Sequence, residues 1–229
     1  MPKPIAVITG ASRGIGRATA LRLAPDYEIV AVARSDFELE SLAQEIEARG
    51  GHCRPRVVDV TDPDAVQAAL AGIDADVLVN NAGVGTTKPF VELTRDEWRR
   101  MVNVNFNALF DVTRALVQPM IDRGSGHIVF IGSISGRSAY KGGTCYAATK
   151  HAVVGFAECL MLELRESAVK VSVVNPGSVA TSFSDSPNQS WKLVAEDVAN
   201  AVAAVLDTPP NVLIHSLEVR TLNPPPSKQ

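Results

Sequence analysis

The stretch that decides the fold is IAVITGASRGIGRATA, residues 5–20. It opens with an apolar run of strand length (5–10) and continues into a helical pattern at 14–24. Gly10, Gly14 and Gly16 follow a GxxxGxG spacing, which allows a tight turn and a close approach of backbone amides to a phosphate. The helix that follows would offer its N-terminus to a pyrophosphate. The stretch predicts a dinucleotide site; a purely structural turn is the alternative.

The alternation of strand and helix continues along the chain. Runs of strand length recur at 28–33, 53–60, 75–81, 126–133, 169–176 and 212–219. Several of them are rich in Val and Ile without polar alternation, which is typical of strands covered on both faces. Helical patterns lie between them at 36–49, 63–71, 94–122, 146–166 and 195–206. We expect an α/β fold with a single Rossmann-type, doubly wound parallel sheet of about seven strands and helices on both faces. Ligands of such sheets bind at the carboxyl ends of the strands.

Composition is that of an ordinary globular protein, with 46% hydrophobic and 21% charged residues and a net charge of −3 in 229 residues. We expect one domain over 1–222 with a loose tail at 223–229, and neither a nucleic-acid nor a membrane partner. The start lacks a signal-peptide pattern, and no apolar run reaches about 18 residues. The three cysteines form no CxxC pair, which favours reduced thiols, a cytoplasmic location and no metal site.

Tyr146 and Lys150 lie four residues apart in GGTCYAATKHAVVGF (142–156), so that a helix would place both on one face. A phenol has a pKa of about 10, and a neighbouring ammonium together with an oxidised nicotinamide would lower that pKa. Ser133, at the end of the strand expected at 126–133, could orient a substrate oxygen beside the phenol. This pattern predicts proton transfer coupled to hydride transfer; a packed tyrosine beside a lysine with a buried stem is the alternative.

The end of the second expected strand bears on the choice of cofactor. An acidic residue there would hold the adenosine ribose hydroxyls of NAD, but Ala33 and Arg34 occupy the region. Arg34 and Arg13 could clamp the 2′-phosphate of NADP(H), which we therefore favour. Asp59 follows the third strand, where it could accept a hydrogen bond from the adenine amino group. Two solvated arginines are the alternative.

Together these residues resemble the short-chain dehydrogenase/reductase family over nearly the whole chain. The matching motifs are TGxxxGxG at 9–16, NNAG at 80–83, YxxxK at 146–150 and NPG at 175–177, with Asn105 aligned to the family's asparagine in MVNVNFNAL. The resemblance implies an NADP(H)-dependent oxidoreductase that moves a hydride between nicotinamide and a secondary alcohol or ketone. A non-catalytic NADP(H)-binding regulator of the same fold is the alternative.

The resemblance also implies the roles of individual residues. The catalytic tetrad would be Asn105, Ser133, Tyr146 and Lys150, with the asparagine main chain holding a water that relays protons from the lysine. The cofactor-binding residues would be Gly10, Ser12, Arg13, Gly14, Ile15, Gly16, Arg34, Asp59, Val60, Asn81, Ala82, Gly83, Tyr146, Lys150, Pro176, Gly177, Val179 and Thr181. A narrower likeness, carried by 131–150 and 194–219, is to NADP-dependent 3-hydroxy acid (serine-type) dehydrogenases.

Other residues have two interpretations each. Arg137 could bind a substrate carboxylate, but a surface arginine is the favoured interpretation. Phe183 and Trp191 are expected in a substrate loop, with a subunit contact as the alternative. Cys145, His127 and His151 are expected to be structural. Apolar residues beyond one sheet-facing stripe on the helices at 94–122 and 146–166 predict a homodimer or homotetramer: Phe106, Phe110, Val154 and Leu162.

Overall fold

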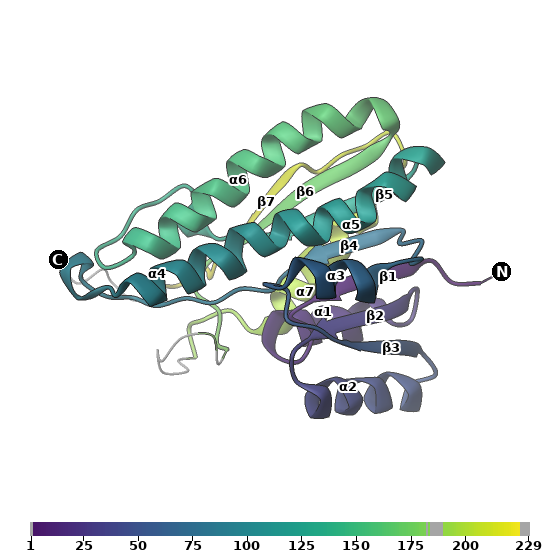
Figure 1. Cartoon of the computed structure of the whole chain (residues 1–229), viewed down its shortest axis with the longest axis horizontal. Helices are drawn as coiled ribbons and strands as arrows, with labels where there is room; N and C mark the ends of the chain where they lie inside the picture. The colour runs from purple at the N-terminus through teal and green to yellow at the C-terminus, as the bar shows by residue number, and fades with distance from the viewer. Residues whose placement is uncertain (1, 182, 184–189, 225–229) are drawn as a thin grey trace.

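The computed structural model describes residues 2–181, 183 and 190–224, and shows one parallel sheet between two layers of helices (Figure 1). The seven strands run in the order β3-β2-β1-β4-β5-β6-β7. Their bounds are β1 Ile5–Thr9, β2 Glu28–Ala33, β3 His52–Val57, β4 Val77–Asn80, β5 Gly126–Ile131, β6 Val169–Pro176 and β7 Ser216–Val219. The longer helices are α1 Gly14–Leu23, α2 Asp36–Ala48, α3 Pro63–Leu70, α4 Arg95–Val102, α5 Ala108–Arg123, α6 Thr144–Leu164 and α7 Ala195–Leu206. The expected doubly wound sheet is confirmed, and its strand order reverses between β1 and β4.

Each face of the sheet has its own apolar core. One core joins the sheet to α3, α5 and α6, with Leu70, Leu116 and Ala157 among its fully buried members. The other joins it to α1, α2 and α7, with Leu23, Leu42 and Val202 among its members. Strands buried on both sides need apolar residues at every position, which explains their unbroken Val/Ile runs.

Local sequence signals set several helix ends. The carboxylate of Asp62 accepts hydrogen bonds from the backbone N–H groups of Asp64 and Ala65 and so caps α3. Thr94 and Glu97 form a reciprocal capping box at the start of α4. The backbone turns left-handed at Gly124, where α5 ends.

Two expected elements differ from the structure. The strand expected at 212–219 forms only over Ser216–Val219, where it pairs with β6. The single helix expected at 94–122 is interrupted by a π-helical segment, η2, at Asn103–Asn107. A π turn widens the helix by one residue and is not visible as an apolar period.

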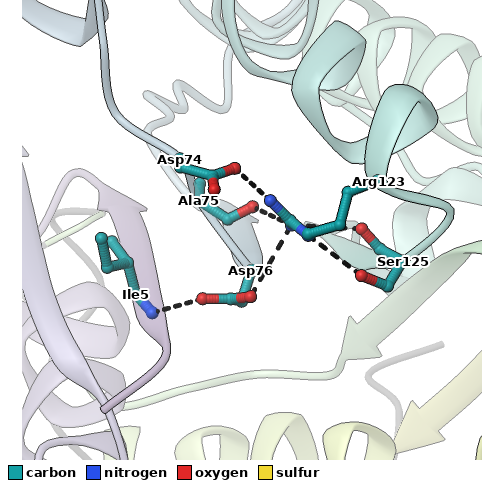
Figure 2. A network of polar contacts seen from close by, with 6 residues as sticks. All are labelled: Ile5, Asp74, Ala75, Asp76, Arg123 and Ser125. Atoms are coloured by element: carbon teal, nitrogen blue, oxygen red, sulfur yellow. Dashed lines mark hydrogen bonds and ion pairs between the residues drawn. The ribbon is translucent and has the colours of Figure 1, made fainter. Parts of the chain in front are cut away.

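At the amino-terminal edge of the sheet, a polar network around Arg123 fastens the end of α5 to the starts of three strands (Figure 2). The guanidinium ion-pairs with Asp74 and Asp76 and donates to the carbonyl oxygens of Ala75 (2.9 Å) and Ser125 (3.1 Å). Asp76 also accepts the backbone N–H of Ile5 at 2.7 Å. This network lies at the edge opposite the strand ends that carry the expected site.

In the described part of the chain, none of the helices combines the length and the apolar character required to cross a membrane. Residues 225–229 of the expected tail lie outside the described residues.

Candidate active site

The glycine turn has the backbone geometry that a phosphate cradle needs. Gly10 and Gly14 have φ angles of +66° and +54°, in the left-handed region that favours glycine. A Cβ at Gly16 would lie 2.3 Å from the carbonyl oxygen of Gly10, so that only glycine lets α1 start this close to β1. No side chain caps the first turn of α1. The free N–H groups at this helix start fit a pyrophosphate group.

The end of β4 is tied to the end of β1 beside this turn. The Thr9 hydroxyl accepts the backbone N–H groups of Asn81 and Ala82, both at 3.0 Å. The Asn81 side chain donates to the carbonyl oxygen of Thr9 at 2.9 Å. These bonds hold Asn81 and Ala82, both predicted cofactor contacts, against the glycine turn.

Pro176 and Gly177 lie at the end of β6, and the loop after them reaches the other side of the turn. The N–H of Gly177 donates to Val219 at 2.8 Å, and Val179 forms a bridge with Leu193. A Cβ at Gly14 would lie 3.5 Å from the Thr181 methyl carbon, so Thr181 faces the glycine turn. The predicted NPG segment therefore adjoins the predicted phosphate site, although the two are far apart in sequence.

Tyr146 and Lys150 share one face of α6 as predicted, and the Lys150 Nζ atom lies 5.8 Å from the centre of the Tyr146 ring. Lys150 is 6% exposed, and its ammonium donates to the carbonyl oxygen of Ile131 at 2.8 Å. Ser133 follows β5 with a buried side chain, and its hydroxyl accepts the backbone N–H of Ser135 at 3.1 Å. The sheet end and the helix thus bring these three predicted catalytic residues together.

Burial dominates the electrostatics of this pair. It raises the pKa of Tyr146 to about 12, against a lowering contribution from a hydrogen bond to Ser133. Burial likewise lowers the pKa of Lys150 to about 8. The predicted lowering of the phenol pKa requires an oxidised nicotinamide as well as Lys150, and it stays a prediction. In the chain itself, desolvation of the phenolate is the largest influence on the pKa of Tyr146.

Asn105 sits in the π-helical turn and is held by three side-chain hydrogen bonds. Its Oδ1 accepts the N–H of Val84 at 2.8 Å, and its Nδ2 donates to the Val84 carbonyl (2.9 Å) and the Thr149 hydroxyl (3.1 Å). Thr149 in turn donates to the carbonyl of Tyr146 at 2.8 Å. The Asn105 side chain therefore joins the segment after β4 to α6.

A small cavity separates Asn105 from Lys150. Its volume is about 10 Å³, and Thr9, Asn80 and Val153 also line it. That volume is close to the lower limit for a single water molecule. The cavity has polar groups on several sides, as a buried water requires.

The expected adenosine side of the site is exposed. Arg34 and Asp59 lie 3.7 Å apart with 64% and 46% of their side chains exposed. Hydrogen bonds from Thr61 and the nearby Arg34 lower the pKa of Asp59 despite partial burial. Arg13 is also exposed, at the start of α1. Ser12 and Ile15 are half-buried in the turn, and Val60 is buried after β3.

Several contacts were not predicted. The Phe183 ring lies 5.8 Å from the Tyr146 ring, and a Cβ at Gly85 would lie 2.5 Å from Phe183. Thr149 and Asn175 also contact the predicted catalytic residues Asn105 and Ser133, respectively. The only signal for Thr149 and Asn175 was their position inside the YxxxK and NPG motifs. Trp191 is half-buried before α7, while residues 182 and 184–189 of the expected substrate loop lie outside the described residues.

The remaining polar candidates have structural surroundings. Arg137 ion-pairs with Glu158 on α6 at 3.4 Å, in line with a surface arginine. Burial raises the pKa of the Cys145 thiol, which favours a packed rather than a nucleophilic side chain. His127 contacts Ser172 and His151 contacts the Ala147 carbonyl. Among the described residues, no group of three or more His, Cys, Asp or Glu side chains could hold a metal ion.

Comparison with known proteins agrees with this geometry. The sequence profile of the short chain dehydrogenase family matches residues 4–191. Dehydrogenase/reductase SDR family member 11 of Gallus gallus is 34% identical over 94% of this chain and 95% of its own length. Serine 3-dehydrogenase of Rhizobium radiobacter is 31% identical over 95% of this chain and 93% of its own length.

A solved structure extends the likeness to the whole fold. An alcohol dehydrogenase from the archaeon Thermococcus sibiricus, complexed with 5-hydroxy-NADP, superposes with a TM-score of 0.92. It is 30% identical and covers 99% of this chain and 100% of its own. The chain therefore belongs to the short-chain dehydrogenase family of oxidoreductases, and serine 3-dehydrogenase is among its relatives.

Proposed function

We propose that this protein is an NADP(H)-dependent oxidoreductase that interconverts a secondary alcohol and a ketone, with Tyr146 as the general acid/base. The observation that carries the proposal is the meeting of Ser133, Tyr146 and Lys150 at the carboxyl end of β5, beside a glycine turn that fits a pyrophosphate. A simple nucleotide-binding fold would need the turn but not a buried phenol and ammonium.

The chain's own groups supply the proton chemistry. A bound NADP(H) would supply or accept the hydride. The Ser133 hydroxyl already accepts an N–H from Ser135, so its own hydrogen is free to be donated to the substrate oxygen. Tyr146 gives a proton to that oxygen during reduction or removes one during oxidation. Its pKa of about 12 suits donation at neutral pH, since the phenol remains protonated.

Lys150 and Asn105 complete the proton path. With a pKa of about 8, Lys150 is largely charged at neutral pH yet gives up a proton far more readily than an ordinary lysine. The cavity between Lys150 and Asn105 could hold a water that returns protons to this path. The side chain of Asn105 is bonded to Val84 and Thr149, so in the proposed path it is the Asn105 main chain that acts on that water.

We infer a preference for NADP(H) over NAD(H). Arg34 lies directly after β2, where an acidic residue would select NAD, and Arg13 lies in the neighbouring turn. Exposed guanidinium groups from two loops suit a 2′-phosphate. The 5-hydroxy-NADP complex of the archaeal relative supports the same choice.

The proposed substrate is a small secondary alcohol or ketone, with 3-hydroxy acids as the first class to test because of the likeness to serine 3-dehydrogenase. A non-catalytic NADP(H)-binding regulator is the second candidate. It would bind cofactor through the same turn but would not need the Tyr146–Lys150 pair.

We also infer a homodimer or homotetramer. Phe110 on α5 and Leu162 on α6 are 53% and 57% exposed, which favours an apolar interface over these two helices. Val154 does not contribute, because it is 8% exposed in the protein's own core; Phe106 packs edge-on against Phe156 at 6.1 Å. The inferred domain spans 1–222. The three cysteines are unpaired thiols, in keeping with a cytoplasmic location.

The test is NADPH consumption against a panel of 3-oxo acids, diketones and aromatic ketones, with 3-hydroxy acids and NADP⁺ in the reverse direction. Tyr146→Phe should abolish turnover and leave NADPH affinity nearly unchanged, because the phenol moves a proton and holds no phosphate. Tyr27→Phe, in the turn between α1 and β2, is the matched control and should keep full activity. Turnover of Tyr146→Phe within about tenfold of wild type would remove the phenol from the mechanism.

A further inference from the structure

Asn175, the residue before the Pro–Gly pair, links the segment that follows β5 to β7 through the two ends of its side-chain amide. It is 3% exposed, at the carboxyl end of β6. Its Oδ1 accepts the backbone N–H of Ser133 at 3.2 Å, and its Nδ2 donates to the Ser216 hydroxyl on β7 at 3.3 Å. One buried amide at the end of β6 thus connects Ser133, which follows β5, to the first residue of β7.

The neighbour of Ser133 is shaped to receive this amide. A Cβ at Gly132 would lie 2.2 Å from the Asn175 Oδ1 and 2.9 Å from a Val173 methyl carbon. Gly132 also donates its own N–H to Val174 at 2.8 Å. Any larger residue at 132 would displace the amide, so Gly132 and Asn175 act as a matched pair.

The result is that Ser133 is held at two points. Asn175 fixes its backbone N–H, and the N–H of Ser135 fixes its hydroxyl oxygen. The residue is extended, with φ −171° and ψ 157°, and its side chain is buried. With one lone pair used by Ser135, the hydroxyl keeps one hydrogen and one lone pair for Tyr146 and the substrate oxygen.

We infer that Asn175 is a positioning residue for the reaction: its amide oxygen sets the place of Ser133, and so the distance at which the Ser133 hydroxyl meets Tyr146 and the substrate. This inference rests on the proposed function. A displacement of about 1 Å in an orienting group is enough to slow a reaction severely. Asn175 acts through Ser133 and touches neither the phenol nor, in the inferred mechanism, the reacting atoms.

The first experiment is a kinetic double-mutant cycle. Asn175→Leu keeps the shape of the side chain but removes the acceptor, and should lower kcat about tenfold with NADPH affinity within about twofold of wild type. When Asn175→Leu is added to Ser133→Ala, kcat should fall by less than about twofold below that of Ser133→Ala alone. The reason is that the effects on kcat of two residues that act as a unit do not add. If the double variant instead shows the product of the two single-variant losses in kcat, Asn175 acts independently of Ser133 and the inference is overturned.

Two further variants separate positioning from simple loss of structure. Asn175→Asp keeps the acceptor oxygen and should therefore keep most of the wild-type kcat that Asn175→Leu loses. Ser216→Ala removes only the outer hydrogen bond, at an exposed residue, and should leave kcat unchanged. Thermal unfolding checks that each variant folds; Asn175→Ala replaces Asn175→Leu if the latter does not fold. If Ser216→Ala lowers kcat as much as Asn175→Leu does, the inference is contradicted.

A second measurement needs no substrate. In Asn175→Leu the amide hydrogen of Ser133 should exchange with solvent at least about tenfold faster than in wild type. Unchanged exchange of the Ser133 amide would overturn the inference. Absence of turnover in wild type would count only against the proposed function, because amide exchange still reports how firmly Asn175 holds Ser133.

Discussion

The ammonium of Lys150 lies 2.8 Å from the main-chain carbonyl oxygen of Ile131, across the join between α6 and the end of β5. This contact directs the charge of a buried lysine toward the end of β5 and, among the described residues, gives it one neutral hydrogen-bond acceptor. A charge held in this way is destabilising, and the lowered pKa of Lys150, about 8, measures that effect.

We therefore expect Lys150→Met to abolish turnover while stabilising the fold by about 1–3 kcal/mol at pH 7, with a rise in Tm of several degrees. The pKa in the folded state lies below that in the unfolded state, so the destabilisation is complete below pH 8 and fades as pH rises to about 10.5. The difference in the free energy of unfolding between Lys150→Met and wild type should therefore shrink between pH 8 and about 10.5. Lys141→Met, on the exposed loop before α6, is the control and should leave Tm unchanged; a Lys150→Met protein less stable than wild type would contradict the argument.

The choice of cofactor should depend on Arg34. Arg34→Ala should weaken NADPH binding by about tenfold or more and leave NADH binding nearly unchanged, because only NADPH carries the 2′-phosphate. Fluorescence titration of both cofactors measures this. Arg99→Ala is a closely matched control, since Arg99 is also 64% exposed and lies 3.8 Å from an aspartate. Equal affinities of wild type for the two cofactors would reject the inferred clamp.

Two helical glycines should respond in opposite ways to the same substitution. Gly16→Ala would place a Cβ 2.3 Å from a backbone oxygen, and should reduce NADPH affinity strongly and lower Tm. Gly155→Ala, in α6, meets nothing within 4 Å and should raise stability by about 0.5–1 kcal/mol through better helix propensity. Cofactor titration and thermal unfolding give both results. A tolerated Gly16→Ala would mean that the turn need not approach α1 so closely.

Acid should destabilise the protein through His127. Burial lowers its pKa to about 4, and its Nε2 donates to Ser172, whose own hydroxyl hydrogen is used on the Ile214 carbonyl at 2.6 Å. The unfolded residue titrates near pH 6.5, so stability is intact above that pH and falls by up to about 3 kcal/mol between pH 6.5 and 4. His127→Asn should flatten this part of the stability–pH curve in denaturant titrations. An equally steep curve in the variant would assign the acid sensitivity to other groups.

The oligomer should depend on the exposed apolar residues of α5 and α6. Light scattering of wild type at micromolar concentration should give a dimer or tetramer of the 24.3 kDa chain. Phe110→Asp combined with Leu162→Glu should shift it toward monomer, because a charge buried without a partner is strongly unfavourable at an interface. Phe37→Glu, on α2 and 82% exposed, is the control and should not change the mass. A wild-type monomer with full activity would reject the interface.

Local patterns were sufficient for the features that depend on neighbours in the chain. The turn at Gly10–Gly16 followed from glycine spacing between an apolar strand and a helix, and the shared face of Tyr146 and Lys150 followed from the helical period. The cap at Asp62 likewise involves residues two and three positions away. In each case backbone dihedral preferences and periodicity act over a few residues, so the sequence alone carries the information.

Other features depend on which distant residues the fold brings into contact. The bonds of Asn105 to Val84 span 21 residues and those of Asn175 to Ser133 and Ser216 span 42 and 41. The π turn at Asn103–Asn107, the burial of Val154 and the raised pKa of Tyr146 also depend on surroundings that no local pattern specifies. The sequence predicted most of the proposed reacting groups, because its motifs place residue types at set spacings. Their hydrogen-bond partners and the dielectric around them exist only once the sheet has assembled, and these decide where each group points and when it holds a proton.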